Sequence, residues 1–202
     1  MKSKKKFLEK FDSDFTDIMV VNTYEENKDE IELVLKRGND LDKSEFFRLK
    51  ISKYLMSLMA LKNYRKALVI IDELEDYLKS VKGQLTSLKQ FGQILTLQKG
   101  KCLLDLGNLH ESKKLFETLV EKYPNNENYF GWLKASKRGL VERITHKVTY
   151  VGLTIFAILW IIEIAGFLEF PLILGSVIGV IILCSVLAEY LLKLIINSTK
   201  PG

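Results

Sequence analysis

The sequence predicts an all-α protein, in which a helical domain is followed by a two-helix hairpin that crosses a membrane. Two observations lead to this fold class. In the first 147 residues, apolar side chains recur every three or four positions, as in Ile31, Val34 and Leu35, which is the spacing of an amphipathic helix. After residue 147 the chain turns almost wholly apolar, over a length that suits membrane-spanning helices. We expect about seven helices before this apolar tail.

The region 1–47 is predicted to be helical and to begin with a basic leader, "MKSKKKFLEKFDSDF". This leader lacks the apolar core that a cleavable secretory signal requires. Residues 7–22 suit either a helix or a short strand, and the helical context favours a helix. Thr23 followed by Glu26 resembles a capping box, so we expect a helix to start there. Ser44 is the expected cap of the next helix.

Residues 93–126 contain "LLDLGNLHESKKLFETLVEKYPNN", which has the pattern of two antiparallel helices. Gly107-Asn108 supplies the turn, because glycine adopts the positive φ of a helix C-cap without strain. The inward stripe of the second helix consists of Leu109, Ser112, Phe116 and Leu119. These residues, ending at Pro124, resemble one tetratricopeptide repeat of 34 residues. The resemblance places Gly100 where the paired helices approach closely and Ser112 at a small-residue position.

A second unit with the same design lies upstream, at residues 48–81. Its turn is expected at Asn63-Tyr64, Ala67 takes the small position, and Ile71 and Leu74 follow on the inner face. Eleven extra residues, 82–92, separate the two units. The segment 127–147 begins a third unit, but its helix is expected to run on into the apolar tail instead of meeting a partner helix.

The chain is therefore divided into a helical region at 1–47, a repeat-like domain at 48–147, a hairpin at 148–196 and a short tail at 197–202. Residues 148–168 and 172–188 are each long enough to cross a bilayer, and the second span reaches residue 196 if Glu189 and Lys193 pair at the interface. The short link around Pro171 makes the spans antiparallel.

Basic residues flank the spans on one side only, and this predicts the topology. They are Lys134, Lys137, Arg138, Arg143, Lys147, Lys193 and Lys200. By the positive-inside rule both termini are cytoplasmic. The expected location is a bacterial cell membrane.

Three residues of the tail have a possible role beyond anchoring. Gly175 and Gly179 form a small-xxx-small pattern, for which the first span is the usual partner and a second copy of the chain an alternative. Glu163 is ionisable within the first span. It either reaches the headgroups near the outer interface or lines a wet interior in an oligomer.

The resemblance to tetratricopeptide repeats also implies a groove lined by the first helix of each unit. The residues that carry this expectation here are Lys53, Met56, Gln98, Lys101 and Trp132. Lysines among methionine and leucine suit a protein or peptide partner with an apolar face and some negative charge. The alternative is that a long helix of the same chain fills the groove.

No catalytic residue, metal site or cofactor is predicted. The two histidines, His110 and His146, are not joined to cysteines or carboxylates at a ligand spacing. The net charge of +5 is spread among acidic runs, which argues against a nucleic-acid partner. We expect a membrane-anchored adaptor that binds a partner protein at the cytoplasmic face. The alternative is a membrane effector whose hairpin oligomerises into a pore under control of the helical domain.

Overall fold

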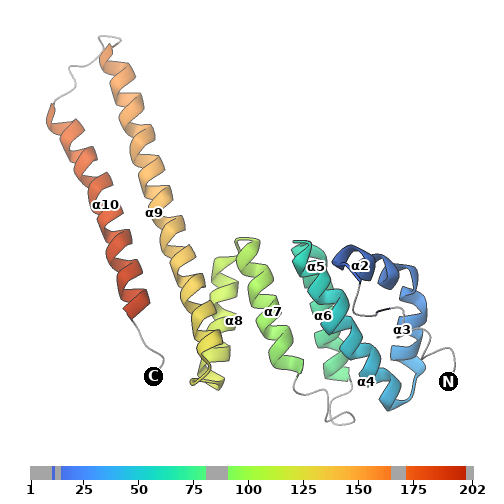
Figure 1. Cartoon of the computed structure of the whole chain (residues 1–202). Coiled ribbons are helices and arrows are strands. Elements are labelled where there is room, and N and C mark those ends of the chain that lie inside the picture. Colours follow the sequence, from blue (N-terminus) through green and yellow to red (C-terminus); the bar gives the residue numbers. More distant parts are fainter. Residues whose placement is uncertain (1–10, 12–14, 81–90, 165–171, 199–202) are drawn as a thin grey trace. The chain divides into compact units, whose positions relative to one another are not determined.

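The computed structural model describes residue 11 and residues 15–80, 91–164 and 172–198. Within these ranges every regular element is a helix and no strand occurs, so the predicted all-α class is confirmed. Contacts divide the chain into two compact units, Met1–Asn108 and Leu109–Gly202. This division falls inside the predicted repeat 93–126. Figure 1 labels the helices of both units.

Among its described residues, the first unit contains five helices of eight or more residues and two short helical segments. In chain order they are α2 (Asp17–Glu26), α3 (Lys28–Arg37), α4 (Asp40–Leu49), the π-helical η2 (Lys50–Leu55), α5 (Met56–Ala60), α6 (Tyr64–Ser80) and α7 (Phe91–Asp105). The segments α4, η2 and α5 follow one another without a break (Figure 1). The helical alternative for residues 17–22 is correct, because they belong to α2.

Both predicted helix starts in this region are wrong. Thr23 lies inside α2, whose cap is Thr16: the Thr16 hydroxyl accepts a hydrogen bond from the Met19 amide at 3.4 Å. Ser44 lies inside α4, whose cap is Asn39: its side-chain oxygen accepts from the Asp42 amide at 2.9 Å. Cap-type residues help a helix only where its first amides lack partners. In both helices an earlier residue, Thr16 or Asn39, already caps these amides.

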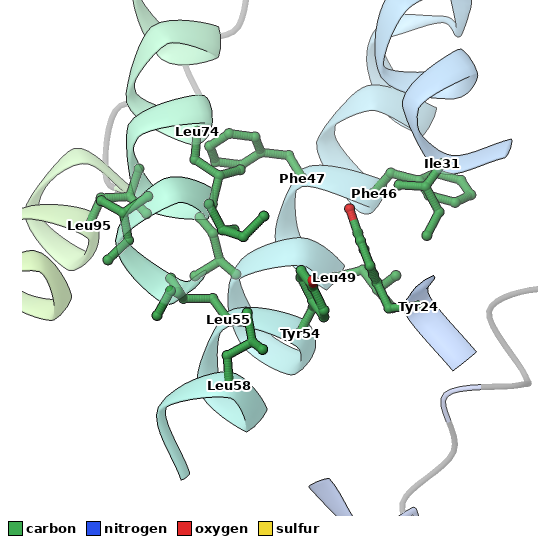
Figure 2. Close-up of a cluster of buried hydrophobic side chains, with 14 of the residues drawn as sticks. Tyr24, Ile31, Phe46, Phe47, Leu49, Tyr54, Leu55, Leu58, Leu74 and Leu95 are labelled. Carbon is green, nitrogen blue, oxygen red and sulfur yellow. The ribbon is translucent and has the colours of Figure 1, made fainter. Parts of the chain in front are cut away.

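The core of the first unit is built mainly from large side chains of α2, α3, α4, η2, α5 and α6, and several of them appear in Figure 2. Fully or almost fully buried members include Tyr24, Ile31, Phe47, Tyr54, Leu55, Leu58, Ile71, Leu74 and Leu95. Burying one such side chain contributes about 1.5–3 kcal/mol relative to leaving it exposed. The rings of Tyr24 and Tyr54 stack with their centroids 3.8 Å apart. The core therefore joins α2 to the η2–α5 stretch.

The two predicted turns between helices have the same backbone conformation and hydrogen-bond pattern. Lys62 has a φ of 58° and Gly107 a φ of 79°. In each turn the following asparagine amide donates to a carbonyl near the end of the preceding helix: Asn63 to Leu58 at 2.8 Å, and Asn108 to Leu103 at 2.7 Å. In the first turn the left-handed residue is Lys62, and Tyr64 already belongs to α6. The turn thus lies one residue earlier than predicted.

The second unit contains α8 (Leu109–Lys122), α9 (Glu127–Ile164) and α10 (Leu172–Ser198). The start of α9 is capped by Asn126, whose side-chain oxygen accepts from the amides of Asn128 and Tyr129 at 3.1 and 3.2 Å. The helix then continues for 38 residues without interruption. This confirms that the predicted third helix runs on into the apolar tail. Figure 1 shows α10 lying alongside α9 in the opposite direction.

Candidate partner-binding surface and membrane hairpin

Four of the five predicted groove residues lie in the first unit. Lys53 is half-buried in η2, and Met56, 43% exposed at the start of α5, is the most exposed of the five. Gln98 and Lys101 lie one helical turn apart on α7. Because of its spacing, this pair belongs to one face of the helix.

The polar side chains of Gln98 and Lys101 are both removed in part from solvent. Gln98 is only 7% exposed, and its side-chain oxygen has no hydrogen-bond partner among the described residues. Partial burial lowers the pKa of the Lys101 ammonium group. A buried amide oxygen without a donor is costly, by about 1–3 kcal/mol. The Gln98 oxygen is thus a polar group of α7 that would gain from a hydrogen-bond donor on a bound partner.

Trp132, the fifth residue, belongs to α9 in the second unit. Its ring stacks on Phe116 of α8, with the centroids 6.1 Å apart. The side chain is half-buried. Trp132 therefore helps to hold α8 against α9, and a groove shared with the four residues of the first unit stays a prediction.

The residues that define the repeat pattern occupy positions that suit their size. Ala67, Gly100, Ser112 and Phe116 are buried. Gly107 has the positive φ that its place in the turn requires. Pro124 is exposed in the link between α8 and α9.

Two polar networks of the first unit were not visible in the sequence. The Tyr54 hydroxyl donates to the Glu25 carboxylate, which also pairs with Lys66 at 2.8 Å. Lys99 bridges α7 to α6 through Asp72 and Glu75, both at 2.7 Å. Burial works against the charge on Lys99, but the hydrogen bonds to these two carboxylates outweigh it and raise its pKa.

Sequence periodicity alone does not reveal these pairs, because each joins residues more than 20 positions apart.

In the second unit, α9 and α10 are long and apolar enough to cross a membrane. The segments with this property are Glu127–Ile162 and Gly179–Ser198, whose most apolar 18-residue windows have mean hydropathies of 1.5 and 2.2. In their most apolar windows only 6% and 0% of residues are buried. A core helix of a soluble protein would instead be mostly buried. Leu153, Ile158 and Leu183, for example, are all more than half exposed.

A set of polar contacts joins the start of α9 to the end of α10. Lys193 pairs with Glu142 at 2.7 Å and with Glu189 at 2.6 Å, so the predicted Glu189–Lys193 pair is confirmed. The Lys134 ammonium donates to the Asn197 carbonyl at 3.0 Å, and Arg138 donates to the Asn197 side chain. These contacts align the polar end of α10 with the polar part of α9.

A close approach between the two helices occurs at a glycine that was not singled out in the sequence. A Cβ added to Gly152 would lie 3.2 Å from Ile182 Cγ1. Nearby, the hydroxyls of Thr149 and Ser185 lie 3.4 Å apart. By contrast, a Cβ added to Gly179 would meet nothing within 4 Å. Gly179 therefore does not make the expected contact with the first span.

Gly175 and Glu163 are helical residues whose surroundings lie outside the described part of the structure. The predicted link around Pro171 and residues 1–10 and 12–14 of the basic leader lie outside the described residues. Among the residues that are described, no three histidine, cysteine or carboxylate side chains are grouped as metal ligands.

No family model, curated protein or solved structure matches this chain. The resemblance to tetratricopeptide repeats thus stays a prediction that rests on the residue pattern and is consistent with the two matching turns.

Proposed function

We propose that the chain is a membrane-anchored adaptor, with α9 and α10 inserted in a bilayer and the helices before residue 148 binding a partner protein at the cytoplasmic face. One observation carries this proposal. The apolar side chains of α9 and α10 are exposed along the length of a bilayer. An exposed apolar surface of this extent is unfavourable in water, and lipid is the medium that would cover it.

The continuity of α9 supports the role of an anchor. The helix begins at Glu127 beside α8 and continues to Ile164 without a break. A partner bound to the first unit would be tethered to the membrane by the covalent link through α8 and α9. Such tethering raises the effective concentration of any partner that is also at the membrane, with no catalytic step required.

The charges favour a cytoplasmic position for both ends of the hairpin. Lys134, Arg138 and Lys193 lie at one end of the α9–α10 pair, where their contacts join the two helices. Basic residues next to spans are retained on the cytoplasmic side. A bacterial cell membrane is the location that we propose.

For the partner we propose a protein segment with an apolar face and acidic residues, bound at Lys53, Met56, Gln98 and Lys101. An acidic group would pair with the lysines, and a donor from the segment would satisfy the Gln98 oxygen. Met56 offers an adaptable apolar contact. Occupation of this surface by another helix of the same chain is the alternative outcome.

The test uses the intact chain, purified from membranes with its cross-linked partner. Lys53→Glu combined with Lys101→Glu should weaken partner capture roughly tenfold, because like charges repel across an interface. The matched control is Lys114→Glu with Lys122→Glu on α8, which makes the same change in net charge on exposed side chains. Equal capture by the two double variants would refute the assignment of the surface.

Membrane insertion and topology need a separate measurement. The chain should resist extraction by alkaline carbonate, and protease added outside right-side-out vesicles should leave residues 91–147 uncut. Release by carbonate would refute the anchor. Cation currents from the purified chain in liposomes, lost in Glu163→Gln, would instead favour the pore-forming alternative.

A further inference from the structure

We propose that the second unit binds an anionic phospholipid at the membrane surface, with its headgroup on Arg143, His146 and Lys147 of α9 and one acyl chain in the groove beside Gly152. This inference rests on the proposed insertion of α9 and α10 in a bilayer. It adds to that proposal a specific lipid class and a specific site.

The headgroup end of the site is an open hollow of about 630 Å³ on α9. It is lined by Arg143, His146, Lys147, Tyr150 and Val151. These residues recur at three- and four-residue intervals, so they form one face of the helix. The only acidic residue next to them along the chain, Glu142, is engaged by Lys193 at 2.7 Å. Within the described part of the chain, neither Arg143 nor Lys147 forms a salt bridge, and the hollow therefore presents positive charge.

The acyl end is a second hollow, of about 370 Å³, that shares Lys147 and Val151 with the first. Its other lining residues are Val148, Gly152, Ile155 and Ile181. Apart from Lys147, the described residues that line it are apolar. Ile181 comes from α10, whereas the others come from α9. The groove therefore runs between the two helices.

Gly152 lets the two helices approach closely beside this groove. Without a side chain, it lets Ile182 of α10 approach to 3.2 Å from the position that a Cβ would take. The neighbouring side chains Val151 and Ile155 are 56% and 48% exposed. Together with Gly152 they line the α9 side of the groove. A hydrocarbon chain is the occupant whose chemistry suits such a lining.

The order of residues along α9 fits the depth profile of a bilayer. Lys147 is the last charged residue before residues 148–162, which carry no charge. Tyr150, 74% exposed, lies where aromatic side chains gather at membrane interfaces. The charged hollow is thus level with headgroups while the apolar groove is level with acyl chains. Basic pockets beside cytoplasmic span ends are known to bind anionic headgroups.

Charge complementarity decides between an anionic and a zwitterionic lipid. Arg143 and Lys147 are both charged at neutral pH, and each basic residue near an anionic surface contributes roughly fivefold to binding. A zwitterionic headgroup carries its own cation, which the two residues would repel. The site should therefore prefer phosphatidylglycerol to phosphatidylcholine.

The test measures which lipid stays with the full chain. The protein is reconstituted in vesicles of phosphatidylcholine with one-fifth phosphatidylglycerol, extracted in mild detergent, and its retained lipids are counted by mass spectrometry. We expect phosphatidylglycerol to be enriched at least fivefold over its share in the vesicles. Arg143→Gln with Lys147→Gln should abolish the enrichment. Lys114→Gln with Lys122→Gln, which removes the same charge on α8, should retain it.

Two further arms separate the lipid site from general charge and from a free phosphate site. Val151→Phe fills the groove without altering charge, so it should reduce enrichment at least threefold. Glycerol 3-phosphate at millimolar concentration should not displace the lipid, because it has no acyl chain. Displacement by glycerol 3-phosphate, or equal loss in the two double variants, would overturn the proposal.

Insertion is checked in the same samples by alkaline carbonate. If the wild-type chain resists carbonate but shows no enrichment, the lipid site is wrong and the membrane anchor stands. If carbonate releases the chain, both inferences are wrong.

Discussion

The stacked pair Tyr24 and Tyr54 allows a sharp test of the packing in the first unit. Both rings are almost fully buried, at 1% exposure each. The Tyr54 hydroxyl donates to the Glu25 carboxylate, whereas the Tyr24 hydroxyl has no hydrogen-bond partner among the described residues. Tyr→Phe removes one hydroxyl and keeps the stacked ring. The two substitutions should therefore have opposite effects on stability.

The size of each change in the free energy of unfolding depends on which hydrogen-bond partners the substitution leaves unsatisfied. A hydrogen bond to a charged group contributes about 1.5–3 kcal/mol. Because Glu25 keeps its pair with Lys66 at 2.8 Å, its carboxylate is not left unsatisfied. We therefore expect Tyr54→Phe to lower the free energy of unfolding by about 1.5 kcal/mol, near the lower limit. Tyr24→Phe removes a buried, unsatisfied hydroxyl, so it should be neutral or stabilise by up to about 1 kcal/mol.

The assay is urea unfolding of the full chain in detergent, followed by circular dichroism. For a slope of about 1.5 kcal/mol per molar urea, the loss in Tyr54→Phe moves the midpoint down by about 1 M. Tyr24→Phe should leave the midpoint unchanged or raise it. A fall of similar size in both variants would refute the reasoning, since it would show that the ring environment and not the Glu25 contact sets the cost.

The same tyrosines predict how stability falls at alkaline pH. Burial, followed by the hydrogen bond to Glu25, raises the pKa of Tyr54 above its ordinary value of 10.0. Burial also raises the pKa of Tyr24 above 10.0. A raised pKa in the folded state means that stability is intact below pH 10 and is lost as the pH rises further. Each tyrosine should contribute about 1.4 kcal/mol of loss per pH unit, so each Phe variant should show a shallower decline above pH 10.

Two other substitutions test elements that join the helices, with unfolding midpoints in the same detergent as the measurement. Lys99→Met removes the ion pairs with Asp72 and Glu75, and it should cost about 1 kcal/mol because these groups are only partly buried; an unchanged midpoint would show that the bridge between α6 and α7 contributes nothing. Gly107→Ala places a side chain at a φ of 79° and should cost about 1–2 kcal/mol, while the control Gly92→Ala, where a Cβ meets nothing within 4 Å, should be neutral or slightly stabilising. Equal effects of the two glycine substitutions would contradict the left-handed turn.

Much of the architecture could be predicted because it depends on neighbours along the chain. Helical periodicity is a relation between residues three or four positions apart, so the apolar stripes that contain Ala67, Ile71 and Phe116 could be identified from the sequence. These three residues are buried in the structure. The length and composition of α9 and α10 are likewise local properties. The pairing of Glu189 with Lys193 followed from their spacing on one helix. For the same reason the turn at Gly107 was placed correctly.

Local signals were insufficient where several residues of one type compete. Thr16 and Thr23, or Asn39 and Ser44, are all able to cap a helix. Which one does so depends on where the packed helix begins. The burial of side chains such as Tyr24 and Phe47 decides where each helix begins. The cap then adds only about 1 kcal/mol of stability.

The contacts between distant residues were decided by the tertiary structure alone. Gly152 and Gly179 are equally small, yet only Gly152 lies against the other helix of the hairpin, next to Ile182. The register between α9 and α10 also pairs Lys193 with Glu142 and brings Ile181 beside Val151. That register depends on how whole surfaces of side chains fit together. A single chain's periodicity carries no information about it, because sliding or rotating one helix against the other leaves the pattern of each helix unchanged.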